Sequence, residues 1–233
     1  MDRLPKLTSL PVLGVAFVLV TVLAATGPLR GLDHQLQAYW SRRYTPNWHD
    51  FLDAFPNAVA GQAVCLPVLA AVAIWLAVRH RTWHPIVIAG AAEVAFYAGI
   101  GGLKLVLARS SPAVGDGEFF SGGFLEHGWY GMAYPSGHAS EAVLIYGAAA
   151  YLLRTYAHPD TRSRTRTFWV VTLIATGSIA VAFYLGFHWP TDLLGGLLAG
   201  GFLLRLVVET DRALTQRRQT GSSIPRSSAS TIR

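Results

Sequence analysis

Long apolar runs constrain this chain more than any other feature of its sequence. Six such runs, most of them roughly 18–25 residues long, alternate with short polar or basic segments. Hydrophobic residues make up 52% of the chain and charged residues only 14%. In lipid a spanning segment must satisfy its own backbone hydrogen bonds, and helices do so. The sequence therefore predicts an all-α, polytopic membrane bundle of six transmembrane helices.

The first predicted span ends near residue 28 and follows two basic residues. It resembles a signal peptide, with small residues at Ala24 and Ala25, but the similar runs that follow favour a retained helix. The other spans are expected at about residues 54–78, 85–108, 136–151, 168–187 and 190–206.

Two segments outside the spans have their own composition. Residues 30–53 mix Trp40, Tyr44 and Trp48 with charges, which predicts an amphipathic segment at the membrane interface. Residues 213–233 are rich in Ser, Thr and Arg, and are expected to form a disordered, basic cytoplasmic tail. The membrane domain is thus expected to cover residues 1–212.

The net charge of +6 reflects membrane topology better than nucleic-acid binding, because the arginines lie in loops between apolar runs. If both termini are cytoplasmic, most of the basic residues lie on the cytoplasmic side of the membrane. These are Arg3, Lys6, Arg79, Arg81, Arg154, Arg162, Arg164, Arg166 and the arginines of the tail. This topology brings the end of the third span, the start of the fourth and the junction of the last two together at the extracytoplasmic side.

Residues suited to phosphate chemistry fall at these three places. Pro135 and Ser136 precede the fourth span, where a proline favours a helix start and a serine caps free amides. The amides of such a helix terminus form a ready anion site, and His138 in the first turn can exchange a proton with the bound anion. Lys104 ends the third span, and His188 with Asp192 opens the sixth. Phosphate chemistry at a membrane surface is the reaction class that this combination predicts.

These residues resemble the type 2 phosphatidic acid phosphatase (PAP2) superfamily, which includes the vanadium haloperoxidases. The family pattern is K-x6-R-P, P-S-G-H and S-R-x5-H-x3-D. The chain has Lys104 and Pro112 at the first spacing, then residues 135–138, then His188 and Asp192. The core motifs span residues 104–196, and the resemblance implies a PAP2-like six-helix fold.

The resemblance also implies a role for each matching residue. His188 is implied as the nucleophile that forms a phosphohistidine, with Asp192 holding its other ring nitrogen. His138 is implied as the general acid. Lys104, the Ser136 hydroxyl and the Gly137 amide are implied to bind the phosphoryl oxygens, with no metal and no other cofactor.

Both motif arginines are replaced. Ser111 stands at the arginine of the first motif, and Val181-Ala182 stands at the Ser-Arg of the third. Arg109 is the substitute expected to bind phosphate. Five residues after Lys104 turn about 140° on a helix, so Arg109 reaches the site only if the helix unwinds before it.

Two function classes follow from this pattern. The first is a multi-pass cell-membrane phosphatase that acts on a lipid phosphate monoester or diphosphate at the extracytoplasmic face. Its partners are expected to be the bilayer and a lipid phosphate (phosphatidate, phosphatidylglycerophosphate or a polyprenyl diphosphate), with no nucleic acid and no obligatory protein partner. The alternative, motivated by the lost arginines, is a degenerate relative that binds or moves a phospholipid without cleaving it. A vanadate-dependent haloperoxidase is a third hypothesis.

Overall fold

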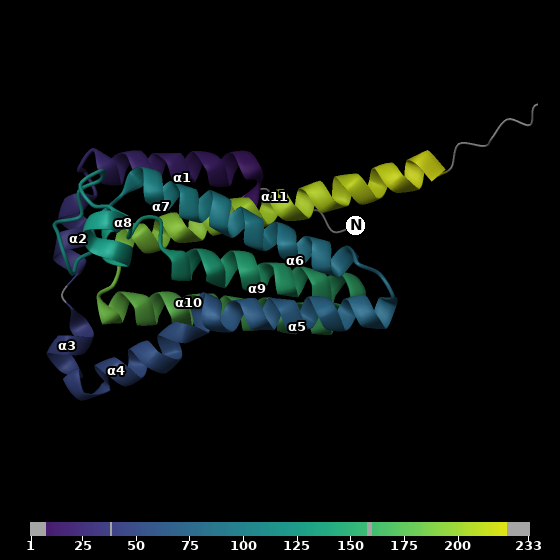
Figure 1. The fold of residues 1–233 in the computed structure, drawn as a ribbon, viewed down its shortest axis with the longest axis horizontal. Coiled ribbons are helices and arrows are strands. Elements are labelled where there is room, and N and C mark those ends of the chain that lie inside the picture. Colours follow the sequence, from purple (N-terminus) through teal and green to yellow (C-terminus); the bar gives the residue numbers. More distant parts are fainter. Residues whose placement is uncertain (1–7, 38, 158–159, 223–233) are drawn as a thin grey trace, which may run out of the picture.

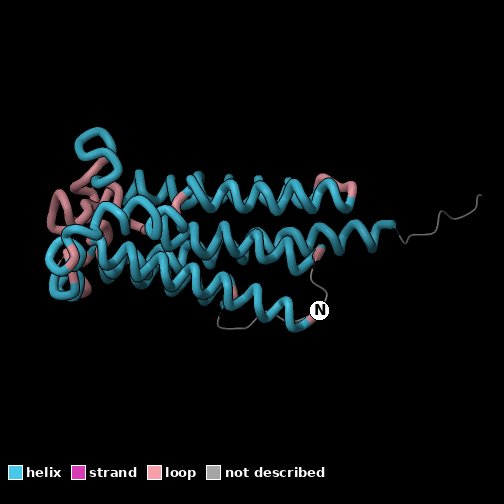
Figure 2. The backbone as a smooth tube through the Cα atoms, turned by 90° about the horizontal axis from the view of Figure 1, so that it is seen from below, coloured by secondary structure: helices cyan, strands magenta, loops and turns pink. Residues whose placement is uncertain are grey.

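Every regular element that the structure describes is a helix. The computed structural model describes residues 8–37, 39–157 and 160–222. The long helices lie side by side along one axis, and most of the short helices and loops gather at one end of the bundle (Figures 1 and 2). The predicted all-α fold is confirmed.

The bundle is built from the long elements. They are α1 (Leu10–Ala25), α5 (Gln62–His80), α6 (His84–Ala95), α9 (Gly137–Tyr156), α10 (Thr161–Leu185) and α11 (Pro190–Ser222). A π-helical turn, η5 (Phe96–Gly101), joins α6 to α7 (Gly102–Leu107) within one continuous rod.

Short elements complete the chain. Between α1 and α5 lie α2 (Arg30–Leu36), α3 (Trp40–Tyr44), η2 (Pro46–Trp48), α4 (His49–Leu52), η3 (Asp53–Asn57) and η4 (Ala58–Ala60). Between α7 and α9 lie α8 (Phe124–His127) and η6 (Gly128–Gly131).

The chain is a multi-pass membrane protein by the length and composition of its helices. Four helices in the described ranges are long and apolar enough to cross a membrane: Pro46–His80, His84–Leu107, Thr161–Leu185 and Pro190–Arg217. A fifth is added if the bent pair formed by α1 and the helical stretch Arg30–Tyr44 counts as one span. Helix α9 is not among these candidates, and its first turns carry His138, Ser140 and Glu141. The count of six spans therefore stays a prediction.

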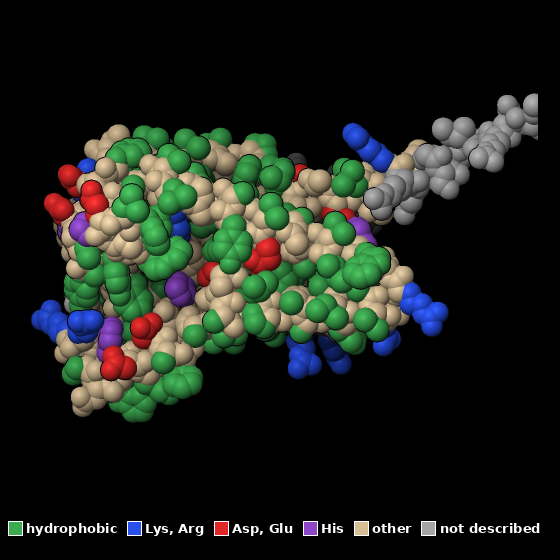
Figure 3. All heavy atoms as spheres, viewed as in Figure 1, with side chains coloured by type: hydrophobic (Ala, Val, Ile, Leu, Met, Phe, Trp, Pro, Cys, Tyr) green, Lys and Arg blue, Asp and Glu red, His purple; other side chains and the backbone are tan. Residues whose placement is uncertain are grey.

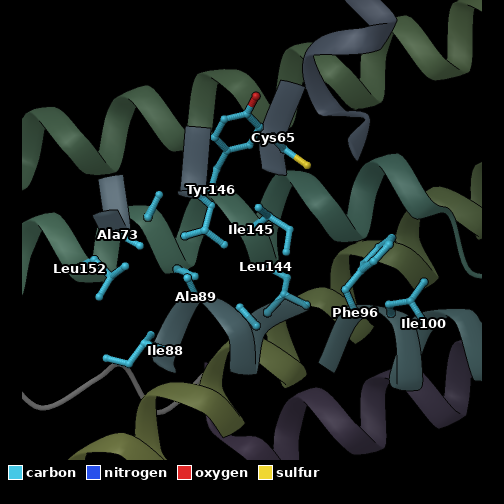
Figure 4. Close-up of a cluster of buried hydrophobic side chains, with 14 of the residues drawn as sticks. Cys65, Ala73, Ile88, Ala89, Phe96, Ile100, Leu144, Ile145, Tyr146 and Leu152 are labelled. Carbon is cyan, nitrogen blue, oxygen red and sulfur yellow. The ribbon is translucent and has the colours of Figure 1, made fainter. Parts of the chain in front are cut away.

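Helix α9 lies at the centre of the bundle and packs against α5, α6, α10 and α11. Apolar side chains from α5, α6, η5 and α9 form the main buried cluster, part of which is drawn in Figure 4. Burial on all sides explains why α9 is rich in alanine, since small side chains let four neighbours approach it.

Glycines bring α9 and α11 into close contact. A Cβ atom on Gly196 would lie 2.5 Å from the Ser136 carbonyl oxygen, and one on Gly200 would lie 2.8 Å from the Ser140 carbonyl oxygen. These two glycines, four residues apart on one face of α11, let the two helix backbones approach closely.

Three boundaries differ from the sequence prediction. The second span is interrupted at Gly61, whose extended backbone ends η4 before α5 begins. Helix α10 begins at Thr161, capped by the Asp160 side chain, so it includes arginines that the sequence places in a loop. Helix α11 continues to Ser222, so the prediction of disorder from residue 213 is wrong as far as 222. Residues 212–220 contain neither proline nor glycine to end the helix. The remainder, 223–233, lies outside the described residues.

The surface separates apolar from basic regions. Hydrophobic side chains are spread along the flank of the bundle, whereas most of the visible Lys and Arg side chains lie toward its ends (Figure 3). The ends of α5 and α9 that carry Arg79, Arg81 and Arg154 lie away from α2, α3 and α8 (Figure 1). Basic side chains also lie over α3 at the opposite end, so the topology stays a prediction.

Candidate active site

The two histidines predicted to react lie next to each other. His138 is in the first turn of α9, and His188 is in the short turn between α10 and α11. Their ring centroids are 6.2 Å apart and the ring planes meet at 62°. The predicted convergence of these two chain segments is therefore present in the fold.

Lys104 reaches the same place from α7. Its Nζ atom donates a hydrogen bond to the Met132 carbonyl oxygen at 2.7 Å. A Cβ atom on Gly137 would lie 3.7 Å from Lys104 Cε, so the lysine stem passes beside the start of α9. The ammonium group is thus held near the helix terminus by a carbonyl, which leaves its other N–H groups for a ligand.

Ser136 and Gly137 form the start of α9. Ser136 is the N-cap residue, and its hydroxyl accepts a hydrogen bond from the Ala139 amide at 3.4 Å. The Ser136 amide donates to the Asp192 carbonyl oxygen at 2.9 Å, which ties this terminus to α11. The helix therefore opens beside both His188 and Lys104, where its first amides and its dipole favour an anion.

Asp192 lies behind His188. Their nearest side-chain atoms, His188 Nδ1 and Asp192 Oδ2, are 3.6 Å apart, which is an ion-pair distance but longer than a hydrogen bond. Burial lowers the pKa of His188 below its usual value, and the Asp192 carboxylate partly opposes that effect. The lowered pKa favours the neutral imidazole, whose Nδ1 faces the carboxylate.

Arg109 does not occupy the place predicted for it. The helix ends at Leu107, so the chain does unwind before Arg109, but the guanidinium is completely buried among protein groups. Nη1 donates to Asp192 Oδ1 at 2.5 Å, Nη2 donates to Asp33 Oδ2 at 2.6 Å, and Nε donates to the Gly117 carbonyl oxygen at 2.8 Å. Every nitrogen of Arg109 is thus used within the protein. The expected phosphate-binding role is wrong for this arrangement, and the residue instead fixes the carboxylate behind His188.

Charge explains why Arg109 is stable in this position. Burial alone would lower its pKa, but the carboxylates of Asp192 and Asp33 raise it above the usual value. A buried guanidinium between two carboxylates is fully paired, which avoids the penalty of an isolated buried charge.

Asp33 and Thr191 belong to this network, and sequence reasoning missed both. Asp33 accepts hydrogen bonds from the Thr191 amide at 3.0 Å and from the Thr191 hydroxyl at 2.6 Å. The Thr191 hydroxyl in turn accepts from Arg109 Nη1 at 2.7 Å. The sequence pattern around Asp33 indicates an interfacial segment and no site residue, because the partners of Asp33 lie 76 and 158 positions away in the chain.

The predicted interfacial segment packs onto the site through several polar contacts. The Gln37 side chain donates to the His188 carbonyl oxygen at 2.7 Å, and the Tyr39 hydroxyl donates to the Pro112 carbonyl oxygen. Thr45 and Tyr184 are joined through their hydroxyl groups at 3.0 Å. Residues 30–37 and 39–45 therefore form a strap that holds the turn carrying His188.

The two positions that lack arginine are both buried. Ser111 is 2% exposed, and its hydroxyl has no hydrogen-bond partner among the described residues. Ala182 packs with Ala139 and Leu193 between α9, α10 and α11. Within the described ranges, no cluster of three or more His, Cys, Asp or Glu side chains is arranged to hold a metal ion.

Comparison with known proteins identifies the family. The family model described as the PAP2 superfamily matches residues 83–215. A lipid A 4'-phosphatase from Bacteroides thetaiotaomicron is 25% identical over 204 residues, which cover 84% of each chain. Phosphatidylglycerophosphatase B from Bacillus subtilis is 31% identical over 88 residues, which cover 38% of this chain and 43% of the relative.

A solved structure shares the fold. It is described as the first transmembrane PAP2 type phosphatidylglycerolphosphate phosphatase from Bacillus subtilis. The two structures align with a TM-score of 0.66 over 88% of this chain and 96% of the other, at 19% sequence identity.

Proposed function

The chain belongs to the PAP2 superfamily and is a membrane lipid phosphatase, and on that premise we propose that it works through a phosphohistidine at the extracytoplasmic face. Its substrate is a lipid phosphate monoester or diphosphate: phosphatidate, phosphatidylglycerophosphate or a polyprenyl diphosphate. The names of the relatives add a lipid A phosphate to this set. The observation that carries the mechanism is the His138–His188 pair, with Asp192 behind one ring and Lys104 beside the other.

The first step transfers the phosphoryl group to His188. Its Nε2 atom attacks phosphorus while the bond from phosphorus to the leaving oxygen breaks, and His138 donates a proton to that oxygen. Asp192 stabilises the positive charge that develops on the imidazole. Arg109, itself paired with Asp33, holds Oδ1 of this carboxylate, whereas His188 faces Oδ2.

The second step restores the enzyme. His138, now neutral, takes a proton from water, and the resulting hydroxide attacks phosphorus as the bond to His188 Nε2 breaks. Through both steps Lys104, the Ser136 hydroxyl and the Gly137 amide hold the non-bridging oxygens, where negative charge develops. Inorganic phosphate leaves, and His188 is free again.

The charge distribution along the chain supports the proposed extracytoplasmic side. The site lies at the end of the bundle that carries α2, α3 and α8, away from the ends of α5 and α9 that carry basic residues. Basic loops favour the cytoplasm, which leaves the site on the other side. A lipid held with its tails along the apolar flank presents its phosphate at this level.

Phosphate release from a lipid panel in detergent tests the proposal. The wild type is expected to release phosphate from at least one lipid, and His188→Ala is expected to release none. His127→Ala provides a matched control, because His127 is an exposed histidine on α8. Turnover that survives in His188→Ala would overturn the mechanism. Tight lipid binding without release from any lipid would favour a protein that only binds or moves phospholipid.

A further inference from the structure

A cavity of about 340 Å³ lies directly beside the turn that carries His188. It is within the range of small-ligand pockets, roughly 300–1,000 Å³. Its lining residues are Tyr39, Arg42, Ala113, Tyr130, Leu185, Gly186 and Phe187. The mechanism above uses none of these side chains.

The walls of the cavity are the segments that position the nucleophile. Leu185, Gly186 and Phe187 directly precede His188 in the chain. Gly186 has φ +83°, and a Cβ atom there would lie 2.8 Å from the Tyr39 ring, so only glycine lets the strap close onto this turn. The cavity therefore lies against the segment that directly precedes His188.

Pro112 and Tyr130 link the cavity to the first motif. The Pro112 carbonyl accepts the Tyr39 hydroxyl, and the Tyr130 carbonyl oxygen accepts the Ser111 amide at 2.8 Å. The cavity thus borders the position where Ser111 leaves a buried hydroxyl without a partner among the described residues.

Arg42 is the charged residue of the lining, and its charge is available. It is exposed, and it forms no ion pair with any residue in the described ranges. Arg109, in contrast, is enclosed by two carboxylates. Figure 3 shows Lys and Arg side chains gathered over α3, at the end of the bundle where the site opens. A guanidinium at the mouth of a cavity with hydroxyls and apolar walls suits a phosphoryl group attached to a carbon skeleton.

We propose that this cavity binds a second phosphoryl group of the substrate, beyond the one that is hydrolysed, and that Arg42 is its main contact. The inference rests on the proposed function and narrows its substrate class. Phosphatidylglycerophosphate, whose two phosphoryl groups are joined by a glycerol, is the substrate that this proposal favours. Phosphatidate has only the scissile phosphate and leaves Arg42 unused.

The test compares phosphatidylglycerophosphate with phosphatidate of the same acyl chains in the same detergent. Arg42→Gln is expected to raise KM for phosphatidylglycerophosphate about tenfold, as expected for one lost charge-assisted hydrogen bond, and to raise KM for phosphatidate much less. The matched control is Arg43→Gln. Arg43 is the next residue on the same helix, but its guanidinium carbon lies 5.5 Å from the Tyr44 ring centroid and the residue does not line the cavity. It is expected to leave the ratio of the two KM values unchanged.

Equilibrium binding separates this inference from the mechanism. His188→Ala protein is expected to bind phosphatidylglycerophosphate more tightly than phosphatidate, and adding Arg42→Gln is expected to remove most of that difference. An equal change for both lipids, or the same change in Arg43→Gln, would overturn the role of Arg42. If the wild type hydrolyses neither lipid while the binding preference depends on Arg42, the proposed function fails and the cavity assignment stands.

Discussion

Arg109 Nη1 donates a hydrogen bond to Asp192 Oδ1 at 2.5 Å, and both side chains are completely buried. Nη2 of the same guanidinium contacts Asp33, so one arginine joins the strap to the helix that opens behind the nucleophile. Arg109 contacts Asp192, which in turn faces His188, so Arg109 acts by positioning Asp192. The site's stability and its chemistry therefore depend on the same buried pair.

Removing Asp33 is expected to lower both the stability of the protein and its phosphatase activity. In Asp33→Ala the buried guanidinium loses one of its two carboxylates, and breaking a buried ion pair costs about 3–5 kcal/mol. Phosphate release is also expected to fall, because Asp192 loses its fixed position. Thermal unfolding in detergent and a phosphate assay measure the two effects. Asp50→Ala, which removes an exposed carboxylate on α4, is the control. Equal behaviour of the two variants would contradict the positioning role.

The covalent intermediate is expected to accumulate when His138 is removed. His138→Ala lowers turnover by about 10²–10⁴-fold, the usual contribution of a general acid and base, and leaves the phosphohistidine without activated water. Mass spectrometry after mixing with a lipid diphosphate, whose leaving group needs little protonation, is expected to find phosphate on His188. The double variant His138→Ala/His188→Ala should carry none, and phosphate there would point to another nucleophile.

The pH profile follows from the lowered pKa of His188. The nucleophile must be neutral, and the neutral form is present above its pKa, which burial places below the usual value near 6.5. The acid limb of kcat/KM is therefore expected below pH 6.5, with activity falling as pH falls through it. Asp192→Asn removes a charge that raises this pKa, so it is expected to move the limb lower while reducing the maximum rate. A limb that moves upward would contradict this assignment.

Close packing of α9 on α11 predicts a sharp contrast between two glycines. Gly196→Ala places a methyl group 2.5 Å from the Ser136 carbonyl oxygen and is expected to cost about 1–3 kcal/mol as an overpacked contact, with loss of activity. Gly90→Ala, on the exposed side of α6, meets nothing within 4 Å. That change is expected to be neutral or to stabilise the helix by up to about 1 kcal/mol. Melting temperatures of the two variants decide the point.

Chelation tests whether the site works without a metal. Lys104 and the first amides of α9 supply the positive charge in the proposed mechanism, so prolonged dialysis against EDTA is expected to leave phosphate release unchanged. Loss of activity that returns with added Mg²⁺ would require a metal in the mechanism.

Much of this arrangement could be predicted from the sequence because it depends on local patterns. Apolar runs indicate helices, and the P-S-G-H run at a helix start indicates an anion site with a histidine beside it. His138, His188 and Lys104 converge because the topology brings three helix ends together. Charge asymmetry along the chain predicts which ends these are.

The roles of Arg109 and Asp33 could not be predicted in this way. They depend on which side chain fills which buried space, and the two residues are 76 positions apart. A basic residue near an expected phosphate site reads as a ligand for phosphate, and an acidic residue in a mixed segment reads as exposed. Only packing shows that the two neutralise each other, and that Arg42, on another helix, lines the cavity.

The π-helical turn at 96–101 has a consequence for how this protein tolerates changes in length. A π turn accommodates one residue more than an α-helical turn, and about 100° of rotation separates successive residues of an α-helix. Deleting a single residue there would let the turn close as an ordinary α-helical turn and keep Lys104 near the start of α9, whereas a deletion in α6 would turn α7 by about that angle and carry Lys104 away. Changes in length within the α-helical parts of this rod are therefore expected to be selected against, whereas the π turn is the place where the loss of one residue is expected to be tolerated.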